Sequence, residues 1–465
     1  MFLYSIMRTT FAYAALAAAF STTYAADVEA DSTGEELISA IPSSTCKFDR
    51  DAAVNVTVTL KDRDIEDGDV FLRRVGMALD DDQQFSWLNN AKAINMQTTP
   101  DCMEALKQLD FIETVEAVVQ VKSFVTQTTA TWGLQRVSND AGASGSPKDE
   151  DFTYTFDDET LGDGVDIYVI DTGVRDTHAA FQGRAVQGFT AFQSSTDGDG
   201  HGTHVAGTAA SARFGVAQKA NIFAVKVLGD GGSGSSSDTI AGMDWVIGNH
   251  NERKSQEGFV GSIMSMSWGL QGTAAAVDQV ILTASDAGIH VSVAAGNDGV
   301  DACGTTPAHL GGAKSNIVTV GSVNIQNEVS TFSNIGQCVD IYAPGEQILS
   351  TWNTGDTVIN FLSGTSMATP GNTGVMAYLM AMDPAGLGQN PAALKAKLLD
   401  TARKNQIAGN LGGSANLLLS NGVDGGIAAK SKRTVTGSPA AWAKSLVHSL
   451  DKRWQLLSSD SPLRF

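Results

Sequence analysis

The chain has 465 residues, 42% of them apolar and 18% charged, which excludes a largely disordered protein and leaves room for more than one folded unit. Lys and Arg number 31 against 51 Asp and Glu, so the net charge is −20. Such an acidic chain repels phosphate backbones and anionic lipid headgroups, and nucleic acid is therefore not an expected partner.

Residues 1–25 are typical of a secretory signal peptide. Arg8 precedes an apolar, alanine-rich run from Phe11 to Phe20, and small residues follow up to Ala25. Met7, directly before Arg8, is an alternative initiator, and a buried hydrophobic helix is the alternative interpretation of the run. The run is too short to span a bilayer, so we expect a secreted, extracellular protein without stable membrane insertion.

Residues 26–124 have the pattern of a small α+β unit. Apolar and polar residues alternate from Val54 to Leu60, as they do in a half-buried strand. A helical stretch follows near Met103 to Leu109, and a second extended run covers Val115 to Val125. A second unit is expected to begin near Trp132.

Beyond Gly164 the sequence changes to short apolar runs separated by helical stretches and glycine-rich turns. Continuous apolar strands between helices indicate an α/β fold with a mostly parallel, doubly wound sheet covered on both faces. Functional residues are then expected at the carboxyl ends of the strands. The expected strands are Val165 to Ile170, Asn221 to Leu228, Ile263 to Ser267, His290 to Ala295 and Ile317 to Val323, and the expected helices include Thr239 to Asn249 and Ala274 to Ala287.

Residues 424–465 form a different kind of segment. Glycine-rich and basic stretches are followed by apolar side chains three or four residues apart between Trp442 and Leu457. With Ser438 as cap and Pro439 in the first turn, this segment is predicted to be an amphipathic helix on a linker. Such a helix either docks back on the main domain or binds a membrane or a partner.

The first motif with candidate chemistry is Asp171-Thr172-Gly173, whose carboxylate follows the strand that ends at Ile170. Asp-Thr-Gly also marks aspartic proteases, but those enzymes need a second such carboxylate to share a proton. The chain has no second Asp-Thr-Gly, and the near matches at Asn353 and Asn372 carry an amide in place of the carboxylate. The aspartic-protease interpretation is therefore disfavoured.

Two longer motifs supply a histidine and a serine. The run from His201 to Thr208 reads His-Gly-Thr-His-Val-Ala-Gly-Thr, and its small residues let a helix pack tightly while the first imidazole faces a cleft. The run from Gly364 to Pro370 reads Gly-Thr-Ser-Met-Ala-Thr-Pro and opens a helical stretch, which places Ser366 beside the positive end of a helix. An ordinary N-cap serine is the alternative for Ser366.

Together these motifs resemble the subtilisin-like serine proteases, or subtilases, in their proteinase K-like branch. The resemblance spans Trp132 to Leu419. It implies a serine endopeptidase that acts on proteins and peptides through an acyl-enzyme, with Ser366 as nucleophile, His201 as general base and Asp171 orienting the imidazole. A non-catalytic peptide-binding relative would lack a member of this triad, and none is missing.

The resemblance also implies how substrate is held. Asn297 matches the family's oxyanion-hole amide, with Gly296 beside it. Two short segments would flank an extended substrate and bind its main chain, Gly232-Ser233-Gly234 and Ser267-Trp268-Gly269. We expect broad specificity with a preference for aromatic or large apolar residues before the scissile bond.

Some residues of the motifs are expected to serve packing and not chemistry. His204, the second histidine of its motif, is interpreted as structural. The residues from Gly371 to Gly374 read Gly-Asn-Thr-Gly where the family usually has His-Val-Ala-Gly. These positions pack the helix, so the departure bears on stability more than on mechanism.

The resemblance divides the chain at Val125, because relatives begin the mature domain shortly before a Trp-Gly-Leu and this chain has that triplet at Trp132. Residues 26–124 would then be a propeptide that templates folding and acts as an intramolecular inhibitor, and 125–423 the catalytic domain. The expected self-cleavage follows Phe124. A permanent N-terminal domain is the alternative.

Four cysteines in an exported chain are expected to form disulfides, and four allow three pairings. A boundary at Val125 favours Cys46 with Cys102 and Cys303 with Cys338, because pairing within each part survives cleavage between them.

No cofactor is required for the expected chemistry, and we expect a monomer. Relatives hold a calcium ion with one carboxylate and with carbonyl groups from a nearby loop. Asp340, Ser315 and Ile317 occupy the matching places, so a structural calcium ion is expected there. A plain surface role for Asp340 is the alternative.

Overall fold

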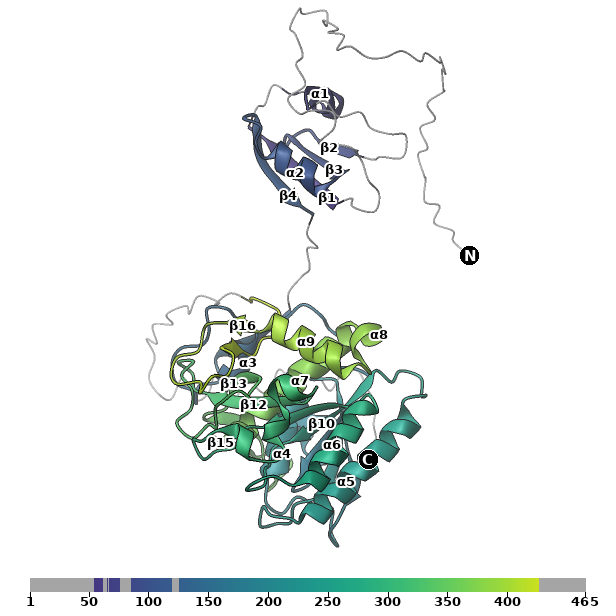
Figure 1. Cartoon of the computed structure of the whole chain (residues 1–465), viewed down its shortest axis with the longest axis vertical. Coiled ribbons are helices and arrows are strands. Elements are labelled where there is room, and N and C mark those ends of the chain that lie inside the picture. Colours follow the sequence, from purple (N-terminus) through teal and green to yellow (C-terminus); the bar gives the residue numbers. More distant parts are fainter. Residues whose placement is uncertain (1–53, 62–64, 66, 76–84, 119–124, 426–465) are drawn as a thin grey trace, which may run out of the picture. The chain divides into compact units, whose positions relative to one another are not determined.

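The structure is a computed structural model that describes residues 54–61, 65, 67–75, 85–118 and 125–425 (Figure 1). Contacts divide the chain into two compact units, Met1–Val121 and Lys122–Phe465. The expected signal peptide, Cys46, Phe124 and the expected C-terminal helix lie outside the described residues. No helix of the part that is described is long and apolar enough to cross a membrane.

In the described residues, the N-terminal unit contains a four-stranded antiparallel sheet and two short helices. The predicted strand is confirmed as β1 (Val54–Leu60), whose Val56 and Val58 are buried. Thr99 caps the predicted helix, which runs three residues earlier than expected because Pro100 occupies its first turn. This helix is α2 (Pro100–Leu106). The other elements are α1 (Gly68–Arg74), β2 (Phe85–Leu88), β3 (Ala93–Thr98) and β4 (Ile112–Ala117), and the strands lie in the order β2-β3-β1-β4.

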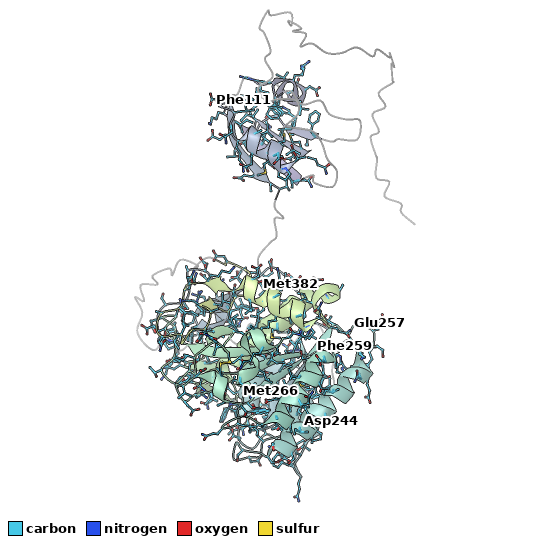
Figure 2. All side chains as sticks on the ribbon, in the orientation of Figure 1. Phe111, Asp244, Glu257, Phe259, Met266 and Met382 are labelled. Atoms are coloured by element: carbon cyan, nitrogen blue, oxygen red, sulfur yellow. A yellow bond between two sulfur atoms is a disulfide. The ribbon has the colours of Figure 1, made fainter. Side chains whose placement is uncertain are left out.

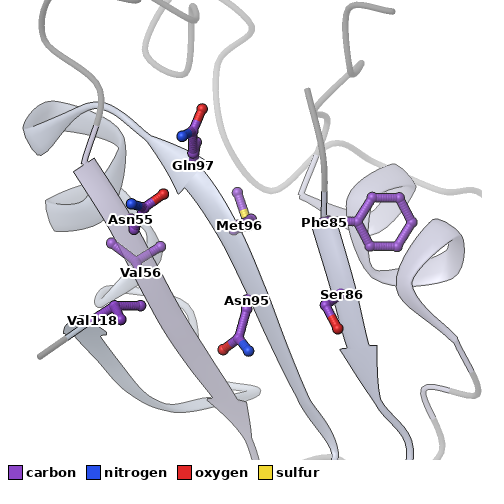
Figure 3. A pocket seen from close by; sticks show the side chains of 8 residues that line it. All are labelled: Asn55, Val56, Phe85, Ser86, Asn95, Met96, Gln97 and Val118. Atoms are coloured by element: carbon purple, nitrogen blue, oxygen red, sulfur yellow. The ribbon is translucent and has the colours of Figure 1, made fainter. Parts of the chain in front are cut away.

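A cavity of about 500 Å³ lies on the sheet of the N-terminal unit (Figure 3). Its lining side chains come from β1, β2 and β3 and from Val118 after β4. None of them belongs to the three motifs, so this cavity is not the candidate site.

The second unit is built on a nine-stranded sheet in the order β16-β17-β13-β12-β11-β10-β7-β9-β8. Strand β16 runs antiparallel to β17, and all other neighbouring pairs are parallel, which confirms the mostly parallel sheet. The strands are β7 (Val165–Asp171), β8 (Ala185–Thr190), β9 (Asn221–Lys226), β10 (Gly261–Met266), β11 (His290–Ala294), β12 (Val318–Val323), β13 (Ile341–Pro344), β16 (Arg403–Lys404) and β17 (Leu417–Leu418).

Helices cover both faces of this sheet, as the doubly wound class requires (Figure 1). Successive side chains of β7 enter different cores: Val169 packs in the core that contains α4 and α7, and Ile170 in the core that contains α5 and α6. The helices are α3 (Trp132–Val137), α4 (His201–Ala210), α5 (Ser236–Arg253), α6 (Ala275–Asp286), α7 (Thr365–Met382), α8 (Pro384–Leu387) and α9 (Pro391–Thr401).

Two antiparallel strand pairs lie outside the main sheet. Strands β14 (Ile348–Thr351) and β15 (Ile359–Leu362) pair with each other, and β5 (Val125–Ala130) pairs with β6 (Phe152–Phe156). Val125 is opposite Phe156, so this residue already belongs to a paired strand of the second unit.

The departure from the usual family sequence after Pro370 lies inside the buried helix α7. Nδ2 of Asn372 donates to the Ser292 hydroxyl at 2.9 Å, whereas its Oδ1 has no hydrogen-bond partner among the described residues. A Cβ at Gly374 would lie 2.7 Å from the carbonyl oxygen of Ala209 on α4, so close packing of the two helices requires glycine there.

The expected disulfide between Cys303 and Cys338 is confirmed, with 5.3 Å between the Cα atoms. It closes a loop of 35 residues between the end of β11 and the start of β13. Cross-linking a loop of that size stabilises a protein by roughly 3–4 kcal/mol in the chain-entropy description. The expected pairing of Cys46 with Cys102 lies outside the described residues.

Candidate active site

Asp171 ends β7 at the carboxyl edge of the sheet, and its side chain is completely buried. Oδ1 accepts the backbone N–H of Thr172 at 2.7 Å and lies 2.8 Å from Nδ1 of His201. The first two motifs therefore meet in space, as their position after β7 and at the start of α4 predicts.

The N-terminus of α4 holds His201 at this edge. Asp197 accepts the backbone N–H groups of Gly200 and Thr203 at 2.8 and 2.9 Å, which satisfies donors that a helix start leaves free. Thr172 Oγ1 donates to Asp197 at 2.9 Å, so the residue after Asp171 is bonded to the same cap. Asp197 was not predicted as a site residue, although the run Asp-Gly-Asp-Gly directly before His201 indicates a helix cap.

Gly202 allows the close approach of α4 to β7. A Cβ at this position would lie 2.1 Å from the carbonyl oxygen of Gly173, a distance that no side chain tolerates. Any larger residue would push His201 away from Asp171.

The charges around His201 favour its protonated form. Burial lowers the pKa of the imidazole, but the charge and hydrogen bond of Asp171 and the charges of Asp199 and Asp197 together raise it above the ordinary value of 6.5. The backbone N–H of His201 also donates to Asp199 at 3.1 Å.

His204 lies one turn further along α4 in a different environment. Its Nε2 donates to the carbonyl groups of Ile348 and Asn360, at 3.0 and 3.1 Å, and so ties α4 to the β14–β15 hairpin. Burial lowers the pKa of His204 to about 4, which keeps the ring neutral. This environment supports the structural interpretation of the second histidine.

Ser366 lies in the first turn of α7, where Pro370 shapes its contacts. Because proline has no N–H, the carbonyl of Ser366 loses its helical donor, and the Ser267 hydroxyl donates to it at 2.9 Å instead. The Ser366 hydroxyl in turn donates to the Ser267 carbonyl at 2.9 Å. Within the described residues no hydrogen bond joins Ser366 to His201, so a proton transfer between them would require the serine side chain to rotate.

Asn297 follows β11 beside the start of α7. Its Oδ1 accepts the backbone N–H of Thr365 at 2.8 Å and the hydroxyl of Thr365 at 3.0 Å. These bonds fix the amide with Nδ2 as the donor that remains for an oxyanion.

A cavity of about 250 Å³ opens next to Asn297. Gly269 and Gly296, both expected substrate-binding residues, belong to its walls, together with Leu270, Ala294 and Ala295. The lining is therefore mixed, because Gln271, Thr305, Thr306 and Asn334 also belong to it and Asp298 adds an exposed carboxylate.

The two expected substrate segments are irregular loops of the described chain. Gly232-Ser233-Gly234 is exposed between β9 and α5, and Ser267-Trp268-Gly269 directly follows β10. Nε1 of Trp268 donates to the carbonyl of Ile170 at 2.8 Å, which anchors the second segment to the strand that carries Asp171.

The three residues expected to bind calcium come together around a lysine. Oδ1 of Asp340 and the carbonyl oxygens of Ser315 and Ile317 lie 2.8, 2.9 and 2.8 Å from Nζ of Lys395. The ammonium group takes the position that an ion would need in order to contact these oxygens. The arrangement therefore does not fit a bound calcium ion.

Comparison with known proteins agrees with this fold. The profile of the Subtilase family matches residues 162–422. Subtilisin-like serine protease Pen ch 18 of Penicillium rubens is 40% identical over 340 residues, covering 68% of this chain and 67% of that protein. The cuticle-degrading protease of Metarhizium anisopliae is 43% identical over 316 residues, covering 68% and 76%. The crystal structure of a cold adapted subtilisin-like serine proteinase is 38% identical with a TM-score of 0.54, covering 63% of this chain and 98% of that one.

A serine at the start of a buried helix and a histidine–carboxylate pair at the edge of a parallel sheet are features of α/β serine proteases. The chain belongs to the Subtilase family. It is a subtilisin-like serine endopeptidase.

Replacing Asp199 with Asn is expected to move the acid limb of the kcat/KM profile to lower pH. The substitution keeps an oxygen that accepts the His201 N–H but removes a charge that raises the pKa of the imidazole. A general base works when neutral, so a lower pKa preserves activity to lower pH. Rates with a peptide substrate across the pH range measure the shift.

The matched control for this prediction is Asp244→Asn, which removes an exposed carboxylate from α5 (Figure 2). Its acid limb should coincide with that of the unaltered protein. An acid limb that moves to higher pH, or not at all, in Asp199→Asn would contradict the assignment of His201 as the titrating base.

Proposed function

We propose that this chain hydrolyses peptide bonds through an acyl-enzyme formed on Ser366. The observation that carries the proposal is the buried 2.8 Å contact between Nδ1 of His201 and Oδ1 of Asp171. A proton on Nδ1 satisfies this carboxylate, and Nε2 is then the basic nitrogen of the ring.

In the proposed reaction the Ser366 hydroxyl turns from the Ser267 carbonyl to His201. Nε2 takes the proton as Oγ attacks the carbonyl carbon, and the imidazolium returns it to the nitrogen as the C–N bond breaks. Water then hydrolyses the ester with the same base. Nδ2 of Asn297 and the N–H of Ser366 donate to the oxyanion, and removal of one such donor lowers turnover by roughly 10²–10³ in enzymes of this type.

Substrate binding is proposed to depend on main-chain contacts and on one cavity that is apolar on one side, at Leu270, Ala294 and Ala295. Gly232-Ser233-Gly234 and Ser267-Trp268-Gly269 bind an extended chain with little sequence preference. The 250 Å³ cavity beside Asn297 takes the side chain before the scissile bond. Burial of an aromatic or large aliphatic side chain there contributes roughly 1.5–3 kcal/mol, which sets a preference without strict specificity.

The protein is further proposed to be secreted as a precursor that cleaves itself before Val125. Residues 26–124 serve as folding template and inhibitor, and residues 1–25 direct export. The pairing of Val125 with Phe156 supports this junction, because Val125 is already part of a strand of the second unit. A cut downstream would remove part of β5 from its pairing with β6.

Ser366→Ala is expected to lose turnover by up to about 10⁶-fold, as triad enzymes do when the nucleophile is removed. The same variant should be secreted with the N-terminal unit still attached, because no active serine is present to cut the chain. Peptide hydrolysis and N-terminal sequencing measure the two losses.

Ser255→Ala, which changes an exposed serine after α5, is the matched control and should be secreted with Val125 as its first residue. A fluorophosphonate should label this control but not Ser366→Ala. Equal labelling of both would refute the nucleophile, and a mature start far from Val125 would refute the junction alone.

Gly269→Val is expected to shift the preference from Phe toward Ala before the scissile bond. A Cβ at Gly269 meets no atom closer than the Thr306 carbonyl oxygen at 3.5 Å, so the new side chain fits but narrows the cavity. The ratio of kcat/KM for Phe over Ala should fall by roughly 10-fold or more.

Gly248→Val on the exposed side of α5 controls for the substitution itself and should leave that ratio unchanged. A peptide library supplies the full profile. A preference for Lys or Arg before the scissile bond in the unaltered protein would overturn the proposed specificity while leaving the hydrolytic mechanism intact.

A further inference from the structure

A buried lysine ammonium lies in a cage of oxygen atoms between α9 and the loop before β12. Nζ of Lys395 donates to the carbonyl groups of Gly312, Ser315 and Ile317, at 2.8, 2.9 and 2.8 Å. Oδ1 of Asp340 lies 2.8 Å away from the same nitrogen. The lysine side chain is 10% exposed and the Asp340 side chain 3%, so water has little access to the charges.

The oxygens of this cage depend on the ammonium group. Asp340 also accepts the N–H groups of Gly312 at 3.1 Å and Thr319 at 2.8 Å, which hold the carboxylate in place beside the loop. The loop carbonyls instead point at Nζ, as a ligand set points at a cation. Without a cation the buried carboxylate would lose its counter-charge and these carbonyls would lose a donor, which is strongly destabilising.

Charge and spacing distinguish an ammonium from a calcium ion here. One carboxylate balances one ammonium, whereas Ca²⁺ normally takes six to eight oxygen ligands at about 2.3–2.6 Å. The distances of 2.8 and 2.9 Å are those of N–H···O bonds. A calcium ion in contact with Asp340 and the carbonyls would lie against Nζ, where two positive charges repel strongly.

The position of Lys395 in α9 explains why its side chain enters the cage. Asn390 caps the helix by accepting the N–H of Ala393 at 3.1 Å, and Pro391 follows the cap. Leu394 and Leu398 are buried on the same helix, so its register is set by the core and directs Lys395 inward.

We propose that Lys395 replaces a structural cation in this fold, so that the ammonium group holds the loop from Gly312 to Ile317 and calcium does not stabilise this site. Removal of the side chain then converts the cage into a site that accepts calcium. The proposal is independent of the hydrolytic mechanism, because it concerns stability alone.

Melting temperatures in chelator and in millimolar calcium test the proposal, with the mature protein first inactivated by a serine-directed inhibitor. The unaltered protein should melt at the same temperature in both. Lys395→Ala should melt roughly 5–15 °C lower in chelator, as expected for a broken buried pair. Calcium should restore most of that loss by entering the vacated space.

Three variants separate this outcome from a plain packing defect. Lys395→Met fills the space without charge, so it should be destabilised and should not respond to calcium. Adding Asp340→Asn to Lys395→Ala should abolish the calcium response. Lys397→Ala, which changes an exposed lysine of the same helix, should leave the melting temperature nearly unchanged in both conditions.

Two results would overturn the proposal. One is a calcium-dependent rise in the melting temperature of the unaltered protein that disappears in Asp340→Asn, because calcium would then use the cage despite Lys395. The other is a melting temperature of Lys395→Ala or Lys395→Met in chelator that equals that of the unaltered protein. If Lys395→Ala does not fold, Lys395→Met and Asp340→Asn still decide between these results.

Discussion

Burial of helix α7 is the constraint on which the active site depends. Every residue from Met367 to Ala381 is buried, and the helix packs on α4 and on the central strands of the sheet. A helix enclosed on all sides cannot slide or rotate without disrupting the core, so the position of Ser366 at its start is fixed. The two hydrogen bonds between Ser366 and Ser267 then join that start to the end of β10.

The histidine is positioned by a second, separate contact between elements. Gly202 lets α4 approach β7 closely, and the cap formed by Asp197 ties the helix start to Thr172. The proposed triad is therefore positioned by two junctions, one between β7 and α4 and one between β10 and α7. What remains adjustable is the Ser366 side chain, which a single rotation can redirect.

The sequence predicted the elements whose pattern is continuous and apolar. The runs beginning at Val165, Asn221 and His290 are strands that start where they were expected, because buried parallel strands are apolar on both faces. Shorter elements such as β16 and β17 have two residues each and no such pattern, so they could not be predicted.

The candidate site was predictable wherever a motif marked it. Asp171 and His201 were identified from local sequence, and the structure brings them into contact. The local sequence does not mark Lys395 as buried, because the nearby Lys397 on the same helix is exposed. The carbonyl partners of Lys395 lie about 80 residues earlier in the chain, between Gly312 and Ile317, and only the packing of α9 against that loop reveals the contact.

Buried lysines stabilise two loops of the second unit in a similar way. Lys226 is 2% exposed, and its Nζ donates to the Thr172 carbonyl at 2.5 Å and to Asp230 at 2.8 Å. Lys226 contacts Thr172, the residue that follows Asp171. Lys395 instead holds a loop that is distant in sequence from the three motifs. In both places the ammonium satisfies backbone carbonyls and pairs with a carboxylate.

The central claim of this account is that Ser366, His201 and Asn297 converge on one reacting carbon. A crystal structure of the mature protein with a fluorophosphonate bound tests it most directly. The account predicts phosphorus bonded to Oγ of Ser366, rotated away from the Ser267 carbonyl, with one phosphoryl oxygen accepting from Nδ2 of Asn297 and His201 within hydrogen-bond distance of the adduct. Phosphorus on another residue, or on Ser366 with its oxygen turned away from Asn297, would contradict it.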